Sequence, residues 1–465
     1  MSKKIVIIGG GITGLSAAHR IIEIQKENNL DLEILLIEKS DKLGGAISTI
    51  EKDGFLIEEG PDMFFTKRPW ALNLSKRLDL DQDLIETNEK KRGTFVLWQK
   101  RLVPVPEGFL MLAPSKILPF LKTSLFSWQG KLRMLMDLFI SKKEVDDESL
   151  ASFVRRRFGN EALERIAQPM IGGVYTADPE KLSLRATMPQ FLELEEKYGS
   201  VIKGMSYNEK ENEGDIGARY SHFLSFKNGM GTLINTIESK LPENSVSLGE
   251  TVKRITPSDQ GWKVLTQKRA TDASAIIITT PSYHAASLIQ NFDPSLGSDL
   301  SSIEYASSAV IILAYKREDI SHDLNGFGFV VPDIENSNLI ACSFSSIKFE
   351  GRAPRGYVLL RAFVGGALNP GICDLEDTIL IQEAEKEVSQ ILGISSAPEF
   401  TILKRYPEAM PQYHVGHLQI VEKIKEKLNR HQCLEIAGNA YSGVGIPDCV
   451  HSGEQAAEGI LKELF

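Results

Sequence analysis

The chain has 465 residues, of which 42% are hydrophobic and 25% charged, the composition of a globular protein with two or three domains. This balance excludes a disordered, collagen-like or coiled-coil protein. The net charge is −9, from 53 basic and 62 acidic residues, so no nucleic-acid partner is expected. The 4 cysteines are scattered and form no CxxC pair, which indicates reduced, buried residues and neither a disulfide scaffold nor a metal site.

The sequence shows no targeting or membrane-spanning segment. A strand begins near Ile5, where a secretory signal would need a basic start followed by an apolar core. The most apolar stretch, 102–120, contains three prolines before Lys116 and also Glu107, so it does not predict a transmembrane helix. We expect 109–120 to lie in a core, with peripheral contact to a membrane as the alternative. A cytoplasmic location is predicted.

The first strong motif is a glycine-rich turn between a predicted strand and a predicted helix. A β-branched run at 4–8 indicates a strand buried on both faces, and the motif Gly9-Gly10-Gly11-Ile12-Thr13-Gly14 follows it. In such a unit Gly9 makes the tight turn, Gly11 lets the backbone approach a pyrophosphate, and Gly14 allows the helix to pack closely. The start of the helix would attract the phosphates. This motif predicts a dinucleotide site, with a turn that binds no nucleotide as the alternative.

A second predicted strand, 32–37, ends in Glu38. A carboxylate at this position can bind both hydroxyls of a ribose and would repel a 2′-phosphate, so NAD or FAD is favoured over NADP. Lys39 follows and is assigned to the same site.

A second pair of glycines distinguishes NAD from FAD. Gly44 and Gly45 come soon after Glu38 and suggest that the backbone passes close to a large, extended cofactor. The arrangement resembles the flavin-containing amine oxidase superfamily, in which this part of the chain lines the pyrophosphate and isoalloxazine of FAD. That family often has Arg or Lys directly after the pair, where this chain has Ala46. The resemblance implies further FAD contacts at Gly60, Pro61, Asp62 and Met63.

Later segments are expected to complete the nucleotide half, with strands at 252–255, 275–279 and 433–437. The superfamily resemblance implies that Val252 contacts the adenine, with an ordinary core valine as the alternative. It also implies that Tyr406 lies against the flavin, with a buried structural aromatic as the alternative. Near the C-terminus a helix is predicted from about 450, and its start would face the flavin. The residues implied as flavin contacts there are Gly438, Asn439, Gly445, Ile446 and Pro447.

These patterns predict an α/β fold with three parts. A discontinuous, Rossmann-like FAD-binding domain would comprise 1–93, 218–284 and 430–465. A helical insertion would comprise 94–217, with helical periodicity at 121–140 and 150–158, a solvated link at 144–148 and a mobile loop at 208–217. A mixed or antiparallel sheet carrying substrate would comprise 285–429, with alternating strands at 310–315, 327–331 and 357–363.

Three longer motifs make the resemblance more specific. They are GGVYTADP at 172–179 with KLS at 181–183, MPQYHVGH at 410–417, and GVGIPD at 443–448. Together they resemble the flavin-dependent porphyrinogen oxidases of haem biosynthesis, most closely the Gram-positive type. The resemblance implies non-covalent FAD and the six-electron oxidation of coproporphyrinogen III by O₂, with release of hydrogen peroxide. Protoporphyrinogen IX as the main substrate is the alternative. The resemblance also implies hand-over of the product to a downstream enzyme of the pathway.

A substrate with four propionates calls for arginine or lysine at the mouth of its cavity. The resemblance favours Lys67 and Arg68 for this role, with a solvated surface pair as the alternative. Asp62 would hydrogen-bond pyrrole N–H groups or cap a turn, and Val174 would pack on the macrocycle or lie in the core. No side chain is assigned as a catalytic acid or base, because the flavin N5 atom accepts the hydride.

Other residues receive structural interpretations. Arg155-Arg156-Arg157 is expected to be a solvated helix face, His414 and His417 to be structural residues, and Cys449 to form no covalent flavin link. Three rival functions share the scaffold. An amine oxidase needs an aromatic cage that Tyr406 alone does not complete, and a carotenoid desaturase should be frankly membrane-bound. A non-catalytic chaperone of lipidated GTPases would usually lack the C-terminal glycines that this chain keeps.

Overall fold

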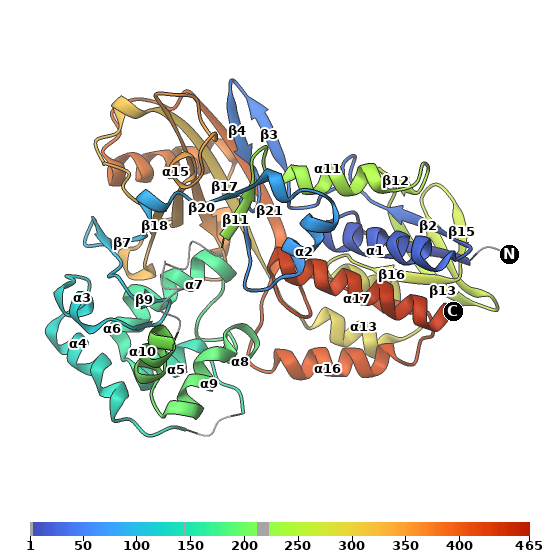
Figure 1. The fold of residues 1–465 in the computed structure, drawn as a ribbon, viewed down its shortest axis with the longest axis horizontal. Coiled ribbons are helices and arrows are strands. Elements are labelled where there is room, and N and C mark those ends of the chain that lie inside the picture. Colours follow the sequence, from blue (N-terminus) through green and yellow to red (C-terminus); the bar gives the residue numbers. More distant parts are fainter. Residues whose placement is uncertain (1–2, 144–145, 212–222) are drawn as a thin grey trace.

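The computed structural model describes residues 3–143, 146–211 and 223–465. At one end of the molecule lies a five-stranded parallel sheet in the order β12-β2-β1-β16-β22 (Figure 1). Its strands come from three distant parts of the chain, which confirms a discontinuous Rossmann-like fold. They are β1 (Lys3–Ile8), β2 (Leu32–Ile37), β12 (Val246–Ser247), β16 (Ala275–Ile278) and β22 (Leu434–Ile436).

The central strand β1 is buried on both faces, as its unbroken apolar sequence predicts. Ile5 and Ile7 share a core with helices α1, α11 and α17, whereas Val6 and Ile8 share one with the sheet β13-β14-β15 and helices α12, α13 and α16. The bounds of the helices are α1 (Ile12–Asn28), α11 (Gly231–Lys240), α12 (Ser282–Ile289), α13 (Pro294–Ser301), α16 (His417–Leu428) and α17 (Ile446–Leu464). Those of the strands are β13 (Val252–Ser258), β14 (Gly261–Thr266) and β15 (Ala270–Ala273).

Helix α17 begins at Ile446, one turn earlier than the sequence predicts. Pro447 is its second residue, where the backbone N–H that proline lacks would have no partner within the helix. The proline is therefore compatible with a helix that begins at Ile446.

The other half of the molecule holds a mixed seven-stranded sheet in the order β21-β17-β20-β19-β18-β7-β8. Its neighbours are antiparallel except for β18 and β7, which are parallel. The predicted alternating strands are confirmed, and β7 and β8 join them from a segment for which helices were expected. The strands are β7 (Phe95–Trp98), β8 (Arg101–Pro104), β17 (Tyr305–Lys316), β18 (Gly328–Val330), β19 (Leu339–Phe344), β20 (Tyr357–Gly365) and β21 (Phe400–Pro411).

Each face of this sheet is covered by a different element. Helix α15 (Asp377–Leu392) packs its apolar side against one face, and the hairpin of β3 (Thr49–Lys52) and β4 (Phe55–Glu58) covers the other. This hairpin directly follows Gly44 and Gly45, so the chain passes from the parallel-sheet half to the mixed sheet at this point. Smaller elements at the junction are β5 (Phe64–Phe65), α2 (Trp70–Arg77), β6 (Leu84–Glu86), β11 (Phe223–Phe226) and α14 (Ser345–Lys348).

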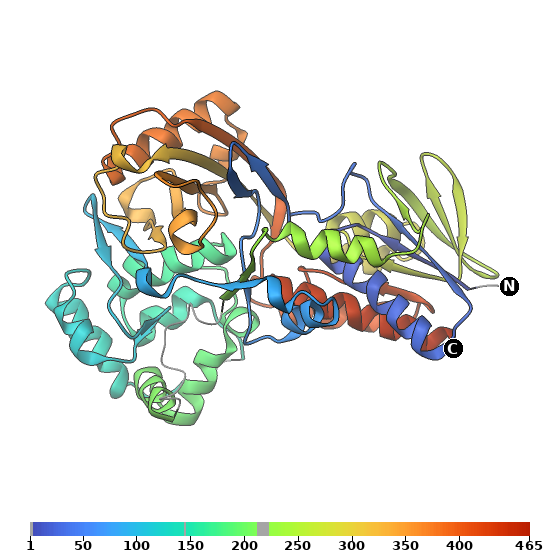
Figure 2. The same cartoon turned by 45° about the horizontal axis from the view of Figure 1, so that its top comes forward.

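A helical region, green and cyan in Figures 1 and 2, packs below the mixed sheet. The helical periodicity predicted at 121–140 is confirmed for 128–138, and the helix breaks before it, where the Ser127 hydroxyl accepts a hydrogen bond from the Gly130 N–H and starts a new helix. Phe109 and Phe120 are buried, which confirms that they belong to a core. The helices include α3 (Ile117–Lys122), α4 (Trp128–Leu135), η3 (Met136–Leu138), α5 (Leu150–Arg157), α7 (Gln168–Tyr175), α9 (Pro189–Tyr198) and α10 (Val201–Glu211).

Two predicted loops lie partly outside the described residues. Of the mobile loop expected at 208–217, residues 208–211 instead end helix α10, and the rest is not described. Of the solvated link at 144–148, only 146–148 are described, and the prediction is wrong for Glu148, which is buried because it pairs with Arg156. Among the helices that the structure describes, none has the length and apolar character needed to cross a bilayer.

Glu435, on the edge strand β22, makes the stability of the parallel sheet depend on pH. Burial and the nearby Glu463 carboxylate raise the pKa of Glu435 from 4.5 to about 7. Because the folded-state pKa is the higher one, this contribution to stability is present below about pH 4.5 and is lost as the pH rises through about 7. We expect Glu435→Gln to stabilise the protein by about 1 kcal/mol at pH 8, after a discount for partial exposure, and to change little at pH 4. Thermal unfolding at both pH values tests this, and parallel pH profiles for the two proteins would contradict it.

Candidate active site

The turn between β1 and α1 has the geometry that its glycines predict. Gly9 has a φ of +113° and packs against Thr279, whose hydroxyl a Cβ would crowd. A Cβ on Gly14 would overlap the carbonyl oxygen of Gly9, so only glycine lets α1 lie this close to the turn. A Cβ on Gly11, in contrast, would meet no atom within 4 Å. Gly9 and Gly14 therefore serve packing, whereas Gly11 leaves open space beside the helix start.

Helices α1 and α17 run side by side (Figure 2). Gly453 of α17 allows the close approach, because a Cβ there would overlap the carbonyl oxygen of Thr13, the second residue of α1. Gly11 precedes α1, whose start no side chain caps within the described chain, whereas at the start of α17 the Asp448 carboxylate accepts a hydrogen bond from the backbone of Gly445. The first N–H groups of a helix lack partners within it and carry a partial positive charge. The uncapped start of α1 therefore favours an anionic group.

Cys449 lies at the same junction and is chemically inert. It is buried against Thr13, and burial raises the pKa of its thiol to about 12. The group therefore stays a protonated thiol at neutral pH, and the thiolate is the nucleophilic form.

Glu38 lies at the end of β2 and directs its carboxylate toward the glycine turn. One oxygen accepts a hydrogen bond from the Gly10 N–H at 2.6 Å, and the other accepts from the Ser40 N–H at 2.8 Å. The adjacent Lys39 is exposed. Val252, the first residue of β13, is half-buried and packs on the core that the parallel sheet shares with β13-β14-β15. These placements bring Glu38 to the turn, while its contact with a ribose and that of Val252 with an adenine stay predictions.

The second glycine pair lies against the first turn. Gly44 forms a parallel bridge with Gly11, and its N–H donates to the carbonyl oxygen of Gly10 at 2.9 Å. A Cβ on Gly45 would lie 3.3 Å from the Cα of Gly11. The two glycine motifs, more than thirty residues apart in sequence, therefore form one surface, with Gly45 and Ala46 exposed on it.

Gly60 joins this surface to the mixed sheet. A Cβ on Gly60 would overlap the carbonyl oxygen of Ala46 and would lie 3.1 Å from the Tyr406 hydroxyl. That hydroxyl is buried and has no hydrogen-bond partner among the described residues. Burial raises the pKa of Tyr406 to about 12, so the hydroxyl remains a donor at neutral pH. A buried donor without a partner is costly and indicates a polar group that the protein alone does not supply. Pro61 and Met63 adjoin this contact and are half-buried.

The turn before α17 forms a further side of the site. Gly438 has a φ of +137°, and its N–H donates to the Ser452 hydroxyl of α17 at 3.0 Å. The Asn439 amide donates to the carbonyl oxygen of Ala409, at the end of β21, at 3.4 Å. Ile446 and Pro447 are buried at the start of the helix. Hydrogen bonds thus tie this turn both to its helix and to the strand that carries Tyr406.

Asp62 lies in a buried ion-pair cluster that the sequence did not predict. Its two oxygens lie 3.1 and 2.9 Å from the Lys348 Nζ, and one lies 3.3 Å from an Arg361 nitrogen. Burial alone would raise the pKa of Asp62, but Lys348 and Arg361 outweigh it and hold the pKa below its usual value. Arg361 also donates to the carbonyl oxygen of Gly60. Asp62 is therefore a fixed carboxylate, and the two cations anchor the segment that carries it.

The sequence around Arg361 indicates a buried ion pair, whereas the sequence around Lys348 indicates it only weakly. Arg361 is the single charged residue in the strand YVLLRAFVG, and a charge in an otherwise buried strand indicates an ion-pair partner. Lys348 ends the short helix α14, and nothing in its local sequence marks its ammonium group as buried.

The predicted propionate-binding residues occupy different places. The Arg68 guanidinium pairs with Asp448 in the first turn of α17 and lies against Gly443. Lys67 is exposed beside it. Val174 is 41% exposed near the end of α7, which excludes a core valine. The structure thus brings Arg68 to the C-terminal turn, while substrate contacts of Asp62, Lys67, Arg68 and Val174 stay predictions.

The expectation that Arg155-Arg156-Arg157 forms a solvated face is wrong for two of its three residues. Arg157 is completely buried and Arg156 is partly buried, because both bind carboxylates of neighbouring helices, whereas Arg155 is exposed. His417 is buried, which lowers its pKa to about 4, so its ring is neutral and packs as a structural residue.

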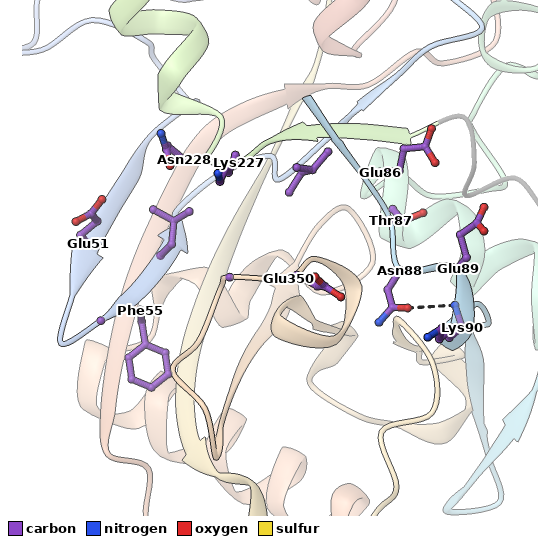
Figure 3. A pocket seen from close by; sticks show the side chains of 14 residues that line it. Glu51, Phe55, Glu86, Thr87, Asn88, Glu89, Lys90, Lys227, Asn228 and Glu350 are labelled. Carbon is purple, nitrogen blue, oxygen red and sulfur yellow. Dashed lines mark hydrogen bonds between the residues drawn. The ribbon is translucent and has the colours of Figure 1, made fainter. Parts of the chain in front are cut away.

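A cavity of about 890 Å³ lies elsewhere, between the β3-β4 hairpin and the segment after β6 (Figure 3). None of its lining residues belongs to the predicted site. It carries four glutamates and two lysines, a balance that disfavours an anionic ligand. The glutamates are Glu51, Glu86, Glu89 and Glu350, and the lysines are Lys90 and Lys227.

Comparison with known proteins agrees with this geometry. Residues 12–461 match the family model described as "Flavin containing amine oxidoreductase". The chain is 36% identical to the coproporphyrinogen III oxidase of Bacillus subtilis strain 168, over 100% of this chain and 99% of the relative. It is 32% identical to the chloroplastic protoporphyrinogen oxidase 1 of Spinacia oleracea, over 98% and 84% of the two chains.

A crystal structure from Exiguobacterium sp. 255-15 superimposes with a TM-score of 0.89 at 28% identity and covers 100% of this chain and 99% of the other. The family match spans α1, the second glycine pair, the mixed sheet and most of α17. The protein is therefore a flavoenzyme of the flavin containing amine oxidoreductase family and, within it, a member of the porphyrinogen oxidase group.

Proposed function

We propose that the protein binds FAD non-covalently and oxidises coproporphyrinogen III to coproporphyrin III with O₂, in haem biosynthesis. The observation that carries this proposal is the convergence of three segments on one place. Gly11 opens space at the start of α1, Gly44 and Gly45 lie on that turn, and the α17 turn completes the site. The uncapped start of α1 suits the pyrophosphate, and Glu38 suits the ribose of its AMP half.

The other end of the site fits a flavin ring. Gly60 and Tyr406 lie together, and the buried Tyr406 hydroxyl has no partner among the described residues, as expected where a heteroatom of a ligand would accept from it. When bound, the flavin supplies the acceptor for a hydride from a bridging carbon of the substrate. The residues Gly438, Asn439, Gly445, Ile446 and Pro447 would line its far end.

The polypeptide contributes position and charge. Oxidation of a porphyrinogen to a porphyrin removes six electrons and six protons, which three molecules of O₂ accept to give three of hydrogen peroxide. Asp62 is held as a carboxylate by Lys348 and Arg361, so it is suited to accept hydrogen bonds from pyrrole N–H groups and not to donate protons. We propose that tautomerisation of the macrocycle releases the protons and that no side chain is required as an acid or base.

Supplying each reduced porphyrinogen in air tests this function directly. Porphyrin fluorescence should rise together with peroxide, in a ratio of three peroxides per porphyrin, and faster with coproporphyrinogen III than with protoporphyrinogen IX. Faster oxidation of protoporphyrinogen IX would favour the alternative substrate. A flavin-loaded protein that oxidises neither would defeat the proposal.

Arg68 provides a test of propionate binding. Its guanidinium is partly exposed, so it can bind a second carboxylate while it pairs with Asp448. We expect Arg68→Ala to raise the KM for coproporphyrinogen III about tenfold and to change kcat less than twofold, since the residue holds substrate without touching the reacting atoms. Arg77→Ala is the matched control, because Arg77 also pairs with a glutamate of α17 but lies outside the site. An unchanged KM for Arg68→Ala would remove Arg68 from the site.

The remaining expectations concern location and partners. We propose a cytoplasmic enzyme that passes its porphyrin to the next enzyme of the pathway. Several large apolar side chains on α3, on α4, on η3 and directly after η3 are exposed, and they define the surface at which peripheral membrane contact would occur. These residues are Leu118, Trp128, Leu132, Met136, Leu138 and Phe139.

A further inference from the structure

Tyr413 lies between the two halves of the molecule, in the segment that connects β21 to α16. Its side chain is 2% exposed and belongs to the hydrophobic core of the helical region. The ring stacks on that of His417, with centroids 3.9 Å apart and an angle of 14° between the planes. The ring is therefore fixed in one orientation, and its hydroxyl points out of the helical core.

That hydroxyl bridges the turn before α17. It donates a hydrogen bond to the carbonyl oxygen of Asn439 at 2.6 Å and accepts one from the Gly443 N–H at 2.8 Å. The turn begins and ends with glycines in left-handed conformations, Gly438 at φ +137° and Gly443 at φ +133°. Glycine permits such angles but does not enforce them. The shape of the turn must be fixed by contacts from outside, and Tyr413 supplies two of them.

The backbone of the same segment is bound to the helical region. The carbonyl oxygen of Tyr413 accepts from the Ser183 N–H at 2.7 Å, and the Val415 N–H donates to the carbonyl oxygen of Lys181 at 2.8 Å. The Asp147 carboxylate accepts from the Ser183 hydroxyl at 2.8 Å and from the Gly416 N–H at 3.1 Å. A movement of residues 181–183 would thus move Tyr413 as well.

We propose that Tyr413 is a positioning residue that sets the shape of the turn at 439–443 and couples it to the helical segment at 181–183. This inference rests on the proposed function, in which that turn lines the flavin and Val174 of the helical region packs on the macrocycle. Burial raises the pKa of Tyr413, so its hydroxyl stays protonated and can donate at every working pH. The residue would act on the reaction through the turn, without touching the reacting atoms.

The variant Tyr413→Phe tests the proposal, because it keeps the stacked ring and removes both hydrogen bonds. The dissociation constant for FAD should rise about tenfold, because the turn that lines the flavin is then no longer held in its binding shape before FAD arrives. The kcat should fall about tenfold with little change in KM. The visible circular dichroism of bound FAD should change, and coproporphyrin III should perturb that signal less than in the parent protein.

Tyr305→Phe is the matched control. The Tyr305 hydroxyl also accepts from a backbone N–H, that of Ser282 at 2.8 Å, but it lies outside the turn. It should alter neither FAD binding nor the flavin signal. A second variant, Asp147→Ala, loosens the backbone links without changing Tyr413, and should reduce the coproporphyrin-induced signal in the same direction.

The outcomes separate the two proposals. A parent protein that binds no FAD would defeat the proposed function itself. A parent protein that binds FAD, together with a Tyr413→Phe variant that has the same FAD affinity and the same flavin signal, would overturn the positioning role alone. Equal losses in Tyr413→Phe and Tyr305→Phe would also overturn it, because the effect would then be one of general stability. If Tyr413→Phe does not fold, an unchanged coproporphyrin-induced signal in Asp147→Ala overturns the coupling.

Discussion

Replacing Gly11 with alanine is expected to leave the protein folded and to remove its flavin. The backbone at Gly11 has a φ of −72° and a ψ of 177°, which alanine adopts without strain. An added Cβ would meet no atom within 4 Å, so the free energy of unfolding of the apoprotein should change by less than about 0.5 kcal/mol. The same methyl group would stand where the proposed pyrophosphate approaches the start of α1.

We expect the dissociation constant for FAD to rise at least about 100-fold in Gly11→Ala, because the methyl group blocks the close approach that brings the pyrophosphate to the helix N–H groups. Titration of the apoprotein with FAD, followed by flavin fluorescence, measures this. Gly371→Ala is the matched control, since a Cβ there also meets nothing within 4 Å and Gly371 lies far along the chain in a short 3₁₀ helix. Retention of FAD by Gly11→Ala would refute the assignment of the turn.

Gly14→Ala gives the complementary result. A Cβ at Gly14 would overlap the carbonyl oxygen of Gly9, so the variant should lose stability even as the apoprotein, by about 1–3 kcal/mol. The two variants, three residues apart, would then differ in what they lose: Gly11→Ala would lose FAD affinity, and Gly14→Ala would lose stability through a packing clash. Equal stability losses in the two apoproteins would mean that the space at Gly11 is not reserved for a ligand.

Local sequence signals were sufficient for the nucleotide half of the fold. The β-branched run of β1, the glycines after it and the carboxylate ending β2 lie within one short stretch, and each has one physical role. The sequence therefore predicted the parallel sheet. It did not predict the approach of Gly44 to the first turn, because the second glycine pair indicated only that the backbone passes close to a large cofactor. The alternating strands were also confirmed, because a period of two is visible along a strand wherever one face is more exposed.

The parts that were missed depend on contacts between residues far apart in sequence. Asp62 is separated from Lys348 and Arg361 by nearly three hundred residues, and only the paired strands of the mixed sheet bring them together. Tyr413 was noted within a motif, but its link to Gly443 follows from the path of two loops, which composition does not encode. Strands β7 and β8 were missed because the helical signal of the residues after them dominated the whole segment.

The buried Arg157 is expected to have the largest effect on stability in the helical region. Its side chain and that of Asp137 are both 0% exposed, and their charged groups lie 3.2 Å apart. Arg157 also lies 2.8 Å from Glu195 and donates to the carbonyl oxygens of Ile140 at 2.8 Å and Gly199 at 3.0 Å. The Arg157 guanidinium, on α5, thus holds together η3, the residues after η3, and the C-terminal part of α9.

Arg157→Met fills a similar volume and removes the charge, so it leaves the buried Asp137 carboxylate without its cation, while Glu195 keeps its pair with Arg156. Breaking such a pair costs about 3–5 kcal/mol, which denaturant unfolding at pH 7 would show. Arg155→Met is the control, because the Arg155–Glu180 pair has side chains 46% and 50% exposed and should cost less than about 1 kcal/mol.

The pH dependence identifies the cause of this loss. Burial already raises the pKa of Asp137, and removing the guanidinium should raise it further. A group whose pKa is raised on folding favours the folded state at low pH, and this advantage disappears as the pH rises through the folded-state pKa. The deficit of Arg157→Met should therefore be smaller at pH 5 than at pH 8, because protonation of Asp137 removes the unpaired charge. A deficit that is the same at both pH values would mean that the lost packing and backbone hydrogen bonds of Arg157, and not its charge, stabilise the helical region.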